Sequence, residues 1–362
     1  MNILSKQRHK QFIVAFIAAT AVITAYVRLM PHTSHVHQPR GSVGAPSEAN
    51  FSVFGTYGRL VFWEEQAVAQ PAEEAIITRL QDLHNRINVF DKKSELSRLN
   101  ASAYARPFHC SDQLWTLLQA ARQAYNETNG AFDVTVGPLM ALWGFHSKRN
   151  RLPDDKEIAT TLAAIGFKKN VTLDDKEHTI HFSHPDTYID FGGLAKGFAL
   201  DLAAGIATTA GVERGLIDLG GNVRCLSKPP PGREAYTVGV RDPMKPDSLL
   251  GRIRLRDCAV ATSGNYENVR TVSGRRIGHI VNPRSGHPTE GVAGVSVVAP
   301  SGLTSDVFST AIFVDGDTLA SVLCKNRNPA GALIVRPGKP VNPPVQMHNW
   351  HWADASDYVY RP

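Results

Sequence analysis

Apolar residues follow two spacings along this chain, and each spacing predicts its own kind of element. Gaps of three and four residues, as between Ile76, Leu80 and Leu83, are typical of a helix that buries one face. This pattern, together with helix-capping residues, predicts helices over 71–88, 111–129, 155–165 and 303–313. Ser111 stands where an N-cap is expected, and Gly130 stands where the same helix ends.

Short or alternating apolar runs predict strands. A hairpin is expected over 171–182, turning at Asp174-Asp175. Strands are expected over 51–63, 215–218, 236–240, 251–255, 258–261, 292–299 and 332–335. Because the helices and strands mix without a strict strand–helix–strand rhythm, we expect an α+β body with one continuous core.

The N-terminal segment differs from this body. Residues 11–27 carry no charge and follow Lys6, Arg8 and Lys10, which is typical of a membrane anchor or a signal peptide. We therefore expect export, with residues 1–30 as the signal or anchor and the rest on the periplasmic side of the inner membrane. Residues 31–50 are expected to form a flexible linker. The remaining parts are a domain over 51–340 and a tail over 341–362, which either docks a partner or, as we favour, caps the sheet.

Charge argues against nucleic-acid binding. The net charge is +6, but residues 1–40 hold five basic residues and no acidic one. Without those five the chain has 34 basic and 33 acidic residues, so the body is close to neutral.

The four cysteines of the chain are far apart and form no CxxC motif, so a structural zinc site is not expected. The pairing of any disulfide stays open, and we favour buried thiols.

The stretch 188–201 is the most informative part of the chain. It is expected to run as a strand at Tyr188 and Ile189, to turn at Gly192-Gly193 and to continue as a helix. A helix N-terminus after such a turn can bind an anion, and Asp190 and Lys196 add both charges. The alternative is that the glycines only permit close packing. A second strand followed by two glycines occurs at 215–221.

Two further groups of polar residues suggest chemistry. Asp306 and Thr310 lie four apart on a predicted helix, hence on one face, and offer the oxygen ligands that magnesium prefers. Carbonyl groups of the glycine turn could add a third ligand. His279 precedes a rigid loop with Arg284, an arrangement that suits a general base beside a phosphate. Singly, each is as compatible with an ordinary surface; together they favour metal-assisted phosphoryl or nucleotidyl transfer.

Six motifs in this order resemble the ApbE family of flavin transferases (FAD:protein FMN transferases), over residues 51 to 335. They are Phe54-Gly-Thr56, Phe90 with Ser94-Glu-Leu-Ser-Arg-Leu-Asn100, Gly130-Ala-Phe-Asp133, Asp190-Phe-Gly-Gly-Leu-Ala-Lys-Gly197, Thr262-Ser-Gly-Asn-Tyr-Glu267 with His279-Ile-Val-Asn-Pro283, and Asp306 to Thr310. The resemblance implies a single T-fold-like catalytic domain. It also implies an enzyme that uses Mg²⁺, cleaves FAD and attaches FMN to a Thr of a target flavoprotein subunit in a membrane electron-transfer complex.

The resemblance also implies roles for individual residues. Magnesium would be held by the Gly193 carbonyl, Asp306 and Thr310, and His279 would be the base that activates the acceptor Thr. FAD would be contacted by Phe54, Phe90, Ala131, Phe132, Asp133, Asp190, Lys196 and Ile280. The chain departs from the family pattern at four positions: Phe54 stands where Met is usual, Asn265 and Asn282 replace Asp, and Ser305 replaces Ala.

Two other functions remain open from the sequence. The same site could act as a FAD diphosphatase that releases FMN and AMP to water. Alternatively, the protein could be a periplasmic flavin-binding carrier or scaffold without turnover.

Overall fold

The structure, a computed structural model, describes residues 45–146, 149–265, 269–325, 331–337, 345–354 and 358–361. Residues 44–362 form one compact unit. The predicted signal or anchor over 1–30, and most of the predicted linker, lie outside the described residues. Among the helices that the structure describes, none combines the length and the apolar character needed to cross a membrane.

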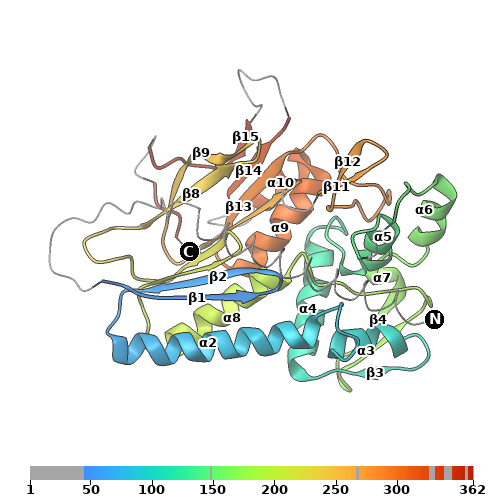
Figure 1. Ribbon diagram of the computed structural model, residues 1–362, viewed down its shortest axis with the longest axis horizontal. Helices are drawn as coiled ribbons and strands as arrows, with labels where there is room; N and C mark the ends of the chain where they lie inside the picture. The colour runs from blue at the N-terminus through green and yellow to red at the C-terminus, as the bar shows by residue number, and fades with distance from the viewer. Residues whose placement is uncertain are drawn as a thin grey trace, which may run out of the picture. The chain divides into compact units, whose positions relative to one another are not determined.

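An eight-stranded sheet forms the centre of the molecule (Figure 1), and every neighbouring pair of its strands is antiparallel. In spatial order its strands are β1 (Ser47–Val53), β2 (Thr56–Phe62), β6 (Gly215–Leu219), β7 (Asn222–Cys225), β10 (Ala259–Gly264), β13 (Gly294–Ala299), β14 (Gly331–Val335) and β15 (Val345–His348). The sheet thus starts within the stretch expected as a linker and ends within the stretch expected as a tail.

The single strand expected over 51–63 is a hairpin instead. β1 and β2 pair with Val53 opposite Thr56, so Phe54 and Gly55 form a two-residue turn. Both turn residues have positive φ, 52° and 72°, as the tight turns that match strand twist require. The alternation of side chains continues through the turn, so the apolar pattern alone did not reveal it.

Side chains alternate across the sheet and divide the expected continuous core into two. In β14, Ala332 and Ile334 belong to one cluster, whereas Leu333 and Val335 belong to the other. The first cluster lies under α2 (Gln66–Ile87), α8 (Ala195–Thr209) and α9 (Gly302–Asp315). Figure 1 shows α2 along the lower edge of the view, with α8 between it and the central strands.

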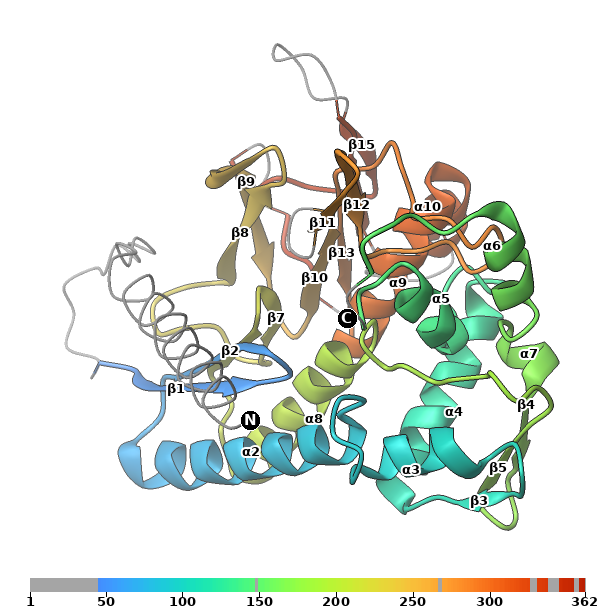
Figure 2. The same ribbon diagram turned by 45° about the vertical axis from the view of Figure 1, so that its right-hand side comes forward.

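The second face of the sheet is covered by a β-hairpin and by the C-terminal residues. The hairpin consists of β8 (Tyr236–Asp242) and β9 (Lys245–Leu255), and Figure 2 shows it standing beside β7 and β10. Trp350 and Tyr360 are buried in this cluster, and the Tyr360 hydroxyl donates to the Asn349 carbonyl. The described part of the tail therefore caps the sheet, the option favoured from the sequence.

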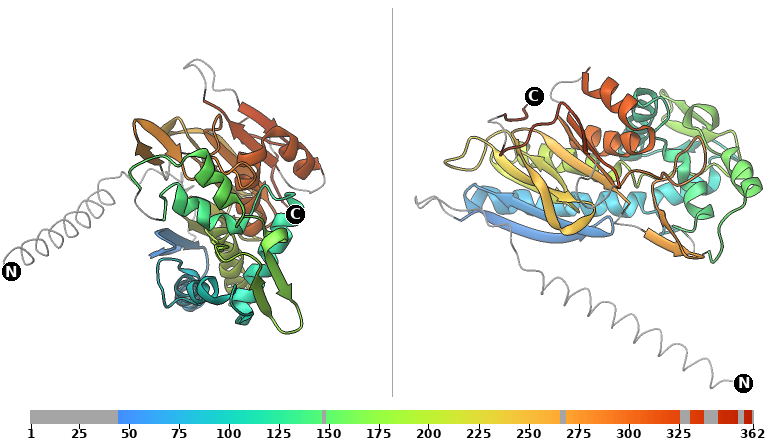
Figure 3. Two further views of the ribbon diagram at one scale, coloured as in Figure 1. Left: turned by 90° about the vertical axis from the view of Figure 1, so that its right-hand side faces the viewer. Right: turned by 90° about the horizontal axis from the view of Figure 1, so that it is seen from above.

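Most of the remaining helices gather at the other end of the sheet from β8 and β9 (Figure 3). These are α3 (Glu95–Ser102), α4 (Asp112–Glu127), η1 (Val134–Val136), α5 (Gly137–Leu142), α6 (Asp155–Leu162) and α7 (Phe167–Asn170). With them lie the small sheet of β3 (Phe108–His109), β5 (Thr179–Phe182) and β4 (Val171–Asp174), and the hairpin of β11 (Val269–Val272) and β12 (Arg275–Gly278). α10 (Asp317–Lys325) follows α9 and packs near β14 and β15.

Two predictions made from local sequence, an N-cap and a hairpin turn, are confirmed in these elements. Ser111 caps α4 by accepting from the Leu114 N–H. The hairpin of β4 and β5 begins its turn after Asp174, as expected. A third apolar cluster, which includes Leu139, Ile158 and Ile277, joins α5 and α6 to the β11–β12 hairpin.

The prediction of a strand at Tyr188 and Ile189 is wrong. This segment pairs with a side chain instead of a strand: Asn100 Nδ2 donates to the Ile189 carbonyl at 2.9 Å, and Asn100 Oδ1 accepts from the Ile189 N–H at 2.8 Å. An amide side chain offers the donor and acceptor of one peptide group, so it can replace a neighbouring strand here. The pairing is invisible in the local apolar pattern.

Candidate active site

Helices α8 and α9 cross with their backbones in direct contact. A Cβ placed on Gly197 would lie 2.4 Å from the Gly302 carbonyl oxygen, and one on Gly302 would lie 2.6 Å from the Gly197 carbonyl oxygen. Only glycine at both positions permits this approach. The crossing brings the first turn of α8 beside Asp306 of α9.

Asp306 is buried, and protein donors hold both of its carboxylate oxygens. Oδ2 accepts from the Gly197 N–H at 2.8 Å, and Oδ1 accepts from Asn222 Nδ2 at 2.9 Å. Asn222 follows the Gly220-Gly221 turn between β6 and β7, and its own Oδ1 accepts from the Thr262 N–H. The second glycine pair of the sequence therefore has a different use from the first: it forms a hairpin that presents Asn222 to Asp306.

The structure brings the other predicted magnesium ligands to the same place. A Cβ on Gly193 would lie 3.9 Å from Thr310 Cγ2, and Thr310 Oγ1 lies 3.1 Å from Ser263 Oγ. Lys196 Nζ lies 3.8 Å from Asp306 Oδ1. We refer to Gly193, Gly197, Asp306 and Thr310, with their partner Asn222, as the α8–α9 crossing.

This set of groups fits magnesium by its chemistry. A carboxylate, a hydroxyl and a backbone carbonyl are all hard oxygen donors, and each Asp306 oxygen keeps a lone pair beyond its hydrogen bond. The described residues contain no group of three or more His, Cys, Asp or Glu side chains that could hold a metal ion. A site here would therefore depend on one carboxylate together with neutral oxygens.

A second group of residues lies around Asp190, and of its members Phe90 and Asp190 itself were predicted as site residues. Asp190 Oδ1 accepts from the Gly192 N–H at 2.8 Å, and its Oδ2 accepts from His146 Nε2 at 2.8 Å. The His146 ring also lies 5.7 Å from the Phe90 ring and 6.2 Å from the Tyr188 ring, measured between centroids. We refer to Phe90, His146, Tyr188 and Asp190 as the His146 cluster. Since Asp190 lies three residues before Gly193, it adjoins the α8–α9 crossing.

His146 was not singled out from the sequence. It follows α5 in the segment Trp143-Gly-Phe-His146, and its partner Asp190 is distant along the chain. No local spacing connects the two residues. Only tertiary contacts reveal the pair.

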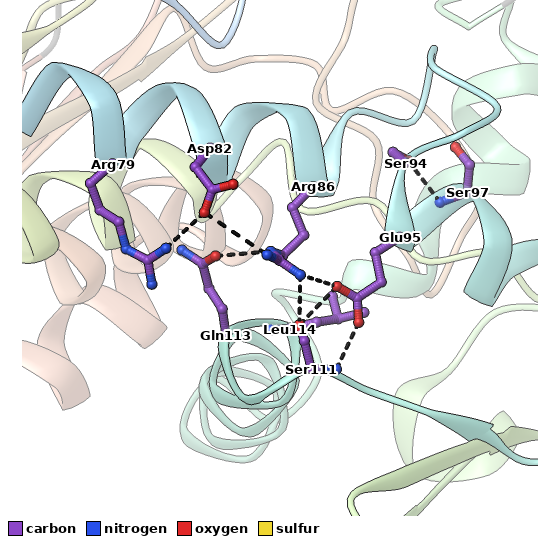
Figure 4. A network of polar contacts seen from close by, with 9 residues as sticks. All are labelled: Arg79, Asp82, Arg86, Ser94, Glu95, Ser97, Ser111, Gln113 and Leu114. Atoms are coloured by element: carbon purple, nitrogen blue, oxygen red, sulfur yellow. Dashed lines mark hydrogen bonds and ion pairs between the residues drawn. The ribbon is translucent and has the colours of Figure 1, made fainter.

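Phe90 occupies an ordered loop whose two ends are joined by an ion pair. Arg86 at the end of α2 donates to Glu95 Oε2 at 2.6 Å, and Glu95 also accepts from the N–H and the hydroxyl of Ser111 (Figure 4). Burial raises the pKa of the Glu95 carboxyl, but the Ser111 and Arg86 donors together hold it below its ordinary value. The loop is fixed at its base while the Phe90 side chain is 71% exposed.

Phe132 and Asp133 of the Ala131-Phe132-Asp133 motif have different structural roles. Phe132 is buried against Gly193, where an added Cβ would lie 2.9 Å from its ring. The Asp133 carboxylate accepts from the N–H and the hydroxyl of Thr135 and from the Phe167 N–H. Burial raises the pKa of Asp133, and these three hydrogen bonds oppose that effect. The carboxylate thus shapes the loop, and its predicted contact with FAD stays a prediction.

His279 and Ile280 follow the β11–β12 hairpin. The His279 ring lies 6.4 Å from the ring of Phe145, which is adjacent to His146. Ile280 is buried, and its carbonyl accepts from the Thr289 N–H. At the tip of the other hairpin, Phe54 packs edge-on against His84 of α2 with ring centroids 5.6 Å apart.

The Arg284 guanidinium, which the sequence suggested as a partner of His279 at a phosphate, contacts other residues in the structure. Its guanidinium pairs with Asp315 at 2.6 Å and donates to the Asn129 carbonyl at 2.8 Å. Asn282 accepts from the N–H groups of Arg284 and Ser285 through its side-chain oxygen. An amide oxygen serves this turn as a carboxylate would, so the departure from Asp at this position leaves the loop intact.

The sequence profile of the ApbE family matches residues 54–334. The chain belongs to the ApbE family. A Haemophilus influenzae protein named FAD:protein FMN transferase is 30% identical over 278 residues, which are 75% of this chain and 80% of that relative. A Vibrio cholerae protein of the same name is 31% identical over 242 residues, which are 66% of this chain and 71% of that relative.

Solved structures of ApbE proteins share the mixed α/β fold. The ApbE protein of Thermotoga maritima superposes with a TM-score of 0.76 at 32% identity, covering 83% of this chain and 96% of that one. The flavin transferase ApbE of Vibrio cholerae gives a TM-score of 0.72 at 26% identity, covering 84% and 96%. The α8–α9 crossing and the His146 cluster therefore lie within an ApbE fold.

Proposed function

We propose that the protein is a magnesium-dependent FAD:protein FMN transferase. Its ApbE family membership and the names of its relatives support flavin transfer from FAD. The observation that supports a metal-assisted reaction is the buried Asp306 carboxylate, which the α8–α9 crossing holds beside Thr310 and Gly193. A fixed carboxylate among neutral oxygens suits a cation bound together with a diphosphate.

The proposed reaction moves the FMN phosphoryl group to a protein hydroxyl. The hydroxyl oxygen of an acceptor Thr attacks the FMN phosphorus of FAD, and the bond from that phosphorus to the bridging oxygen breaks. His279 accepts the hydroxyl proton, and AMP leaves with the bridging oxygen. Magnesium held by the Gly193 carbonyl, Asp306 and Thr310 would neutralise diphosphate charge. Lys196 adds a positive charge at the same place.

The proposed acceptor is a flavoprotein subunit of a membrane electron-transfer complex, and the proposed location is the periplasmic side of the inner membrane. The location is supported by the sequence of residues 1–30, in which basic residues precede an uncharged run. Cell fractionation tests the location: recovery of the mature protein with cytoplasmic markers would contradict it.

Transfer is tested by incubating the protein with FAD, Mg²⁺ and a target domain that carries an acceptor Thr. Covalent flavin fluorescence on the denatured target is the expected result. The controls are the same target with Thr replaced by Val, and the enzyme variant His279→Ala. AMP released at the same rate without the target would identify a diphosphatase instead, and FAD kept intact for hours would identify a carrier.

A further inference from the structure

The segment that carries His146 is fastened at several points. Trp143 Nε1 donates to the Gly286 carbonyl at 2.7 Å, and Arg270 donates to the Trp143 carbonyl at 2.7 Å. The Phe145 N–H donates to the Met140 carbonyl at the end of α5. These bonds fix the backbone next to His146.

His146 in turn fixes Asp190. The exposed fractions of the two side chains are 16% and 15%, so the pair lies at the border between the interior and solvent. With the Gly192 N–H on Oδ1 and His146 on Oδ2, the carboxylate is held at both oxygens. A carboxylate has about four acceptor positions, so two remain for a ligand.

We propose that His146 is a substrate-positioning residue for the nucleotide. Its Nε2–H holds Asp190 so that the free lone pairs of the carboxylate meet hydroxyl or amino donors of FAD, while Phe90 covers the bound ring system. This inference rests on the proposed function, because it takes FAD as the ligand. It adds a residue whose role neither the motifs nor the relatives' names indicate.

The surroundings support a binding role over a purely structural one. Phe90, the ring next to His146, is 71% exposed, so the cluster opens to solvent on that side. The pair is mostly buried, so its hydrogen bond can also contribute to folding, and the melting temperatures of the variants measure that contribution. A fixed acceptor at an open site, in contrast, lowers the cost of ordering when a ligand binds.

The test compares two substitutions that separate the donor from the ring. His146→Phe keeps an aromatic ring beside Phe90 and Tyr188 but removes the Nε2–H. His146→Gln removes the ring but keeps an N–H at a similar reach. His109→Ala, which removes an exposed histidine in β3, is the matched control. FAD affinity is measured by fluorescence titration with Mg²⁺ and without an acceptor protein, and KM and kcat are measured with one.

We expect His146→Phe to weaken FAD binding about tenfold, and His146→Gln to stay within about threefold of the unmodified protein. KM for FAD should rise in the Phe variant while kcat changes little, whereas a purely structural role would lower its melting temperature without raising KM. Tighter FAD binding in the Phe variant would show that His146 competes with the nucleotide, which overturns the proposal. The proposal also fails if the Phe variant binds FAD normally, or if the Gln variant is the weaker binder.

The binding measurement separates this proposal from the proposed function. A protein that binds FAD but transfers no flavin contradicts the transferase function, and the ranking of the two variants still tests His146. A protein that transfers flavin with equal FAD affinity in all variants contradicts the role of His146 alone.

Discussion

The α8–α9 crossing and the His146 cluster hold their carboxylates by different means. Asp306 is buried between two helices and a hairpin, and its partners Gly197 and Asn222 belong to elements of the main core. Asp190 lies in a loop, and its partners are a neighbouring N–H and a histidine at the border with solvent. The crossing is therefore built before any ligand arrives, whereas the His146 cluster leaves one side open. Such a division suits a site that holds reacting phosphates rigidly and admits a large nucleotide.

The strongest test of this contrast between the two sites is to replace Asp306, the carboxylate of the α8–α9 crossing. Asp306→Asn keeps the shape but replaces one acceptor oxygen by an NH₂ group, which meets the donors of Gly197 or Asn222. We expect flavin transfer to fall by at least about a hundredfold, because the proposed metal site loses its negative charge. A Mg²⁺ titration of the transfer rate measures this. Asp317→Asn, in α10, is the control, and a variant Asp306→Asn with normal activity would rule out the crossing as the metal site.

A second prediction concerns the rigidity of the crossing. Gly197→Ala places a Cβ 2.4 Å from the Gly302 carbonyl oxygen, so the helices must separate. We expect a loss of about 1–3 kcal/mol in the free energy of unfolding and a fall in transfer activity. Gly205→Ala, in the same helix, meets nothing within 4 Å and should stabilise the protein by about 0.5–1 kcal/mol. Chemical denaturation measures both; equal effects of the two substitutions would contradict the close crossing.

The third prediction uses pH to test the base of the Phe90 loop. The pKa of Glu95 lies below its ordinary value of 4.5 in the folded protein, so its ion pair stabilises above that pH. The stabilisation is lost as the pH falls through the folded pKa. Glu95→Gln should cost about 1–2 kcal/mol near neutral pH, and the difference from the unmodified protein should shrink in acid. Melting curves between neutral pH and acid measure it; a constant difference would contradict this role.

The smallest effect is expected at the open side of the His146 cluster. Phe90→Ala removes an exposed ring, so the melting temperature should not change. Loss of stacking should weaken FAD binding several-fold, about 0.5–1.5 kcal/mol. Tyr104→Ala, another exposed aromatic residue, is the control for fluorescence titration. A large fall in stability would show that Phe90 supports the fold instead.

Prediction from the sequence succeeded for two local signals, missed the local turn at Phe54-Gly55, and failed where a distant side chain decides. Ser111 and the Asp174 turn act within a few residues, and both were found. The Ile189 segment has the composition of a strand, but Asn100 supplies its partner, so the expected strand is absent. Ordered motifs located the residues of the α8–α9 crossing. They did not indicate that Asn222 completes it, because a hairpin turn alone gives no sign of what lies opposite.

The His146 cluster shows the same limit at the site itself. Asp190 stood out because it precedes a glycine pair, whereas His146 has no such neighbour. Arg284 stood out because it is close to His279 in sequence, yet Asp315 and the Asn129 carbonyl take its guanidinium. Nearness along the chain was a poor guide to contact in a loop.

The position of Asp306 late in the chain also has a consequence for the synthesis of the protein. Synthesis proceeds from the N-terminus, so Gly197 and Asn222 leave the ribosome well before α9 does. A chain that ends before α9 contains the residues of the Phe90 loop and of the Gly192-Gly193 turn, but it lacks the carboxylate that the proposed chemistry needs. Catalytic competence is thus postponed until nearly the whole domain has been made. Interrupted chains that end before α9 would lack Asp306 and with it the metal site proposed here.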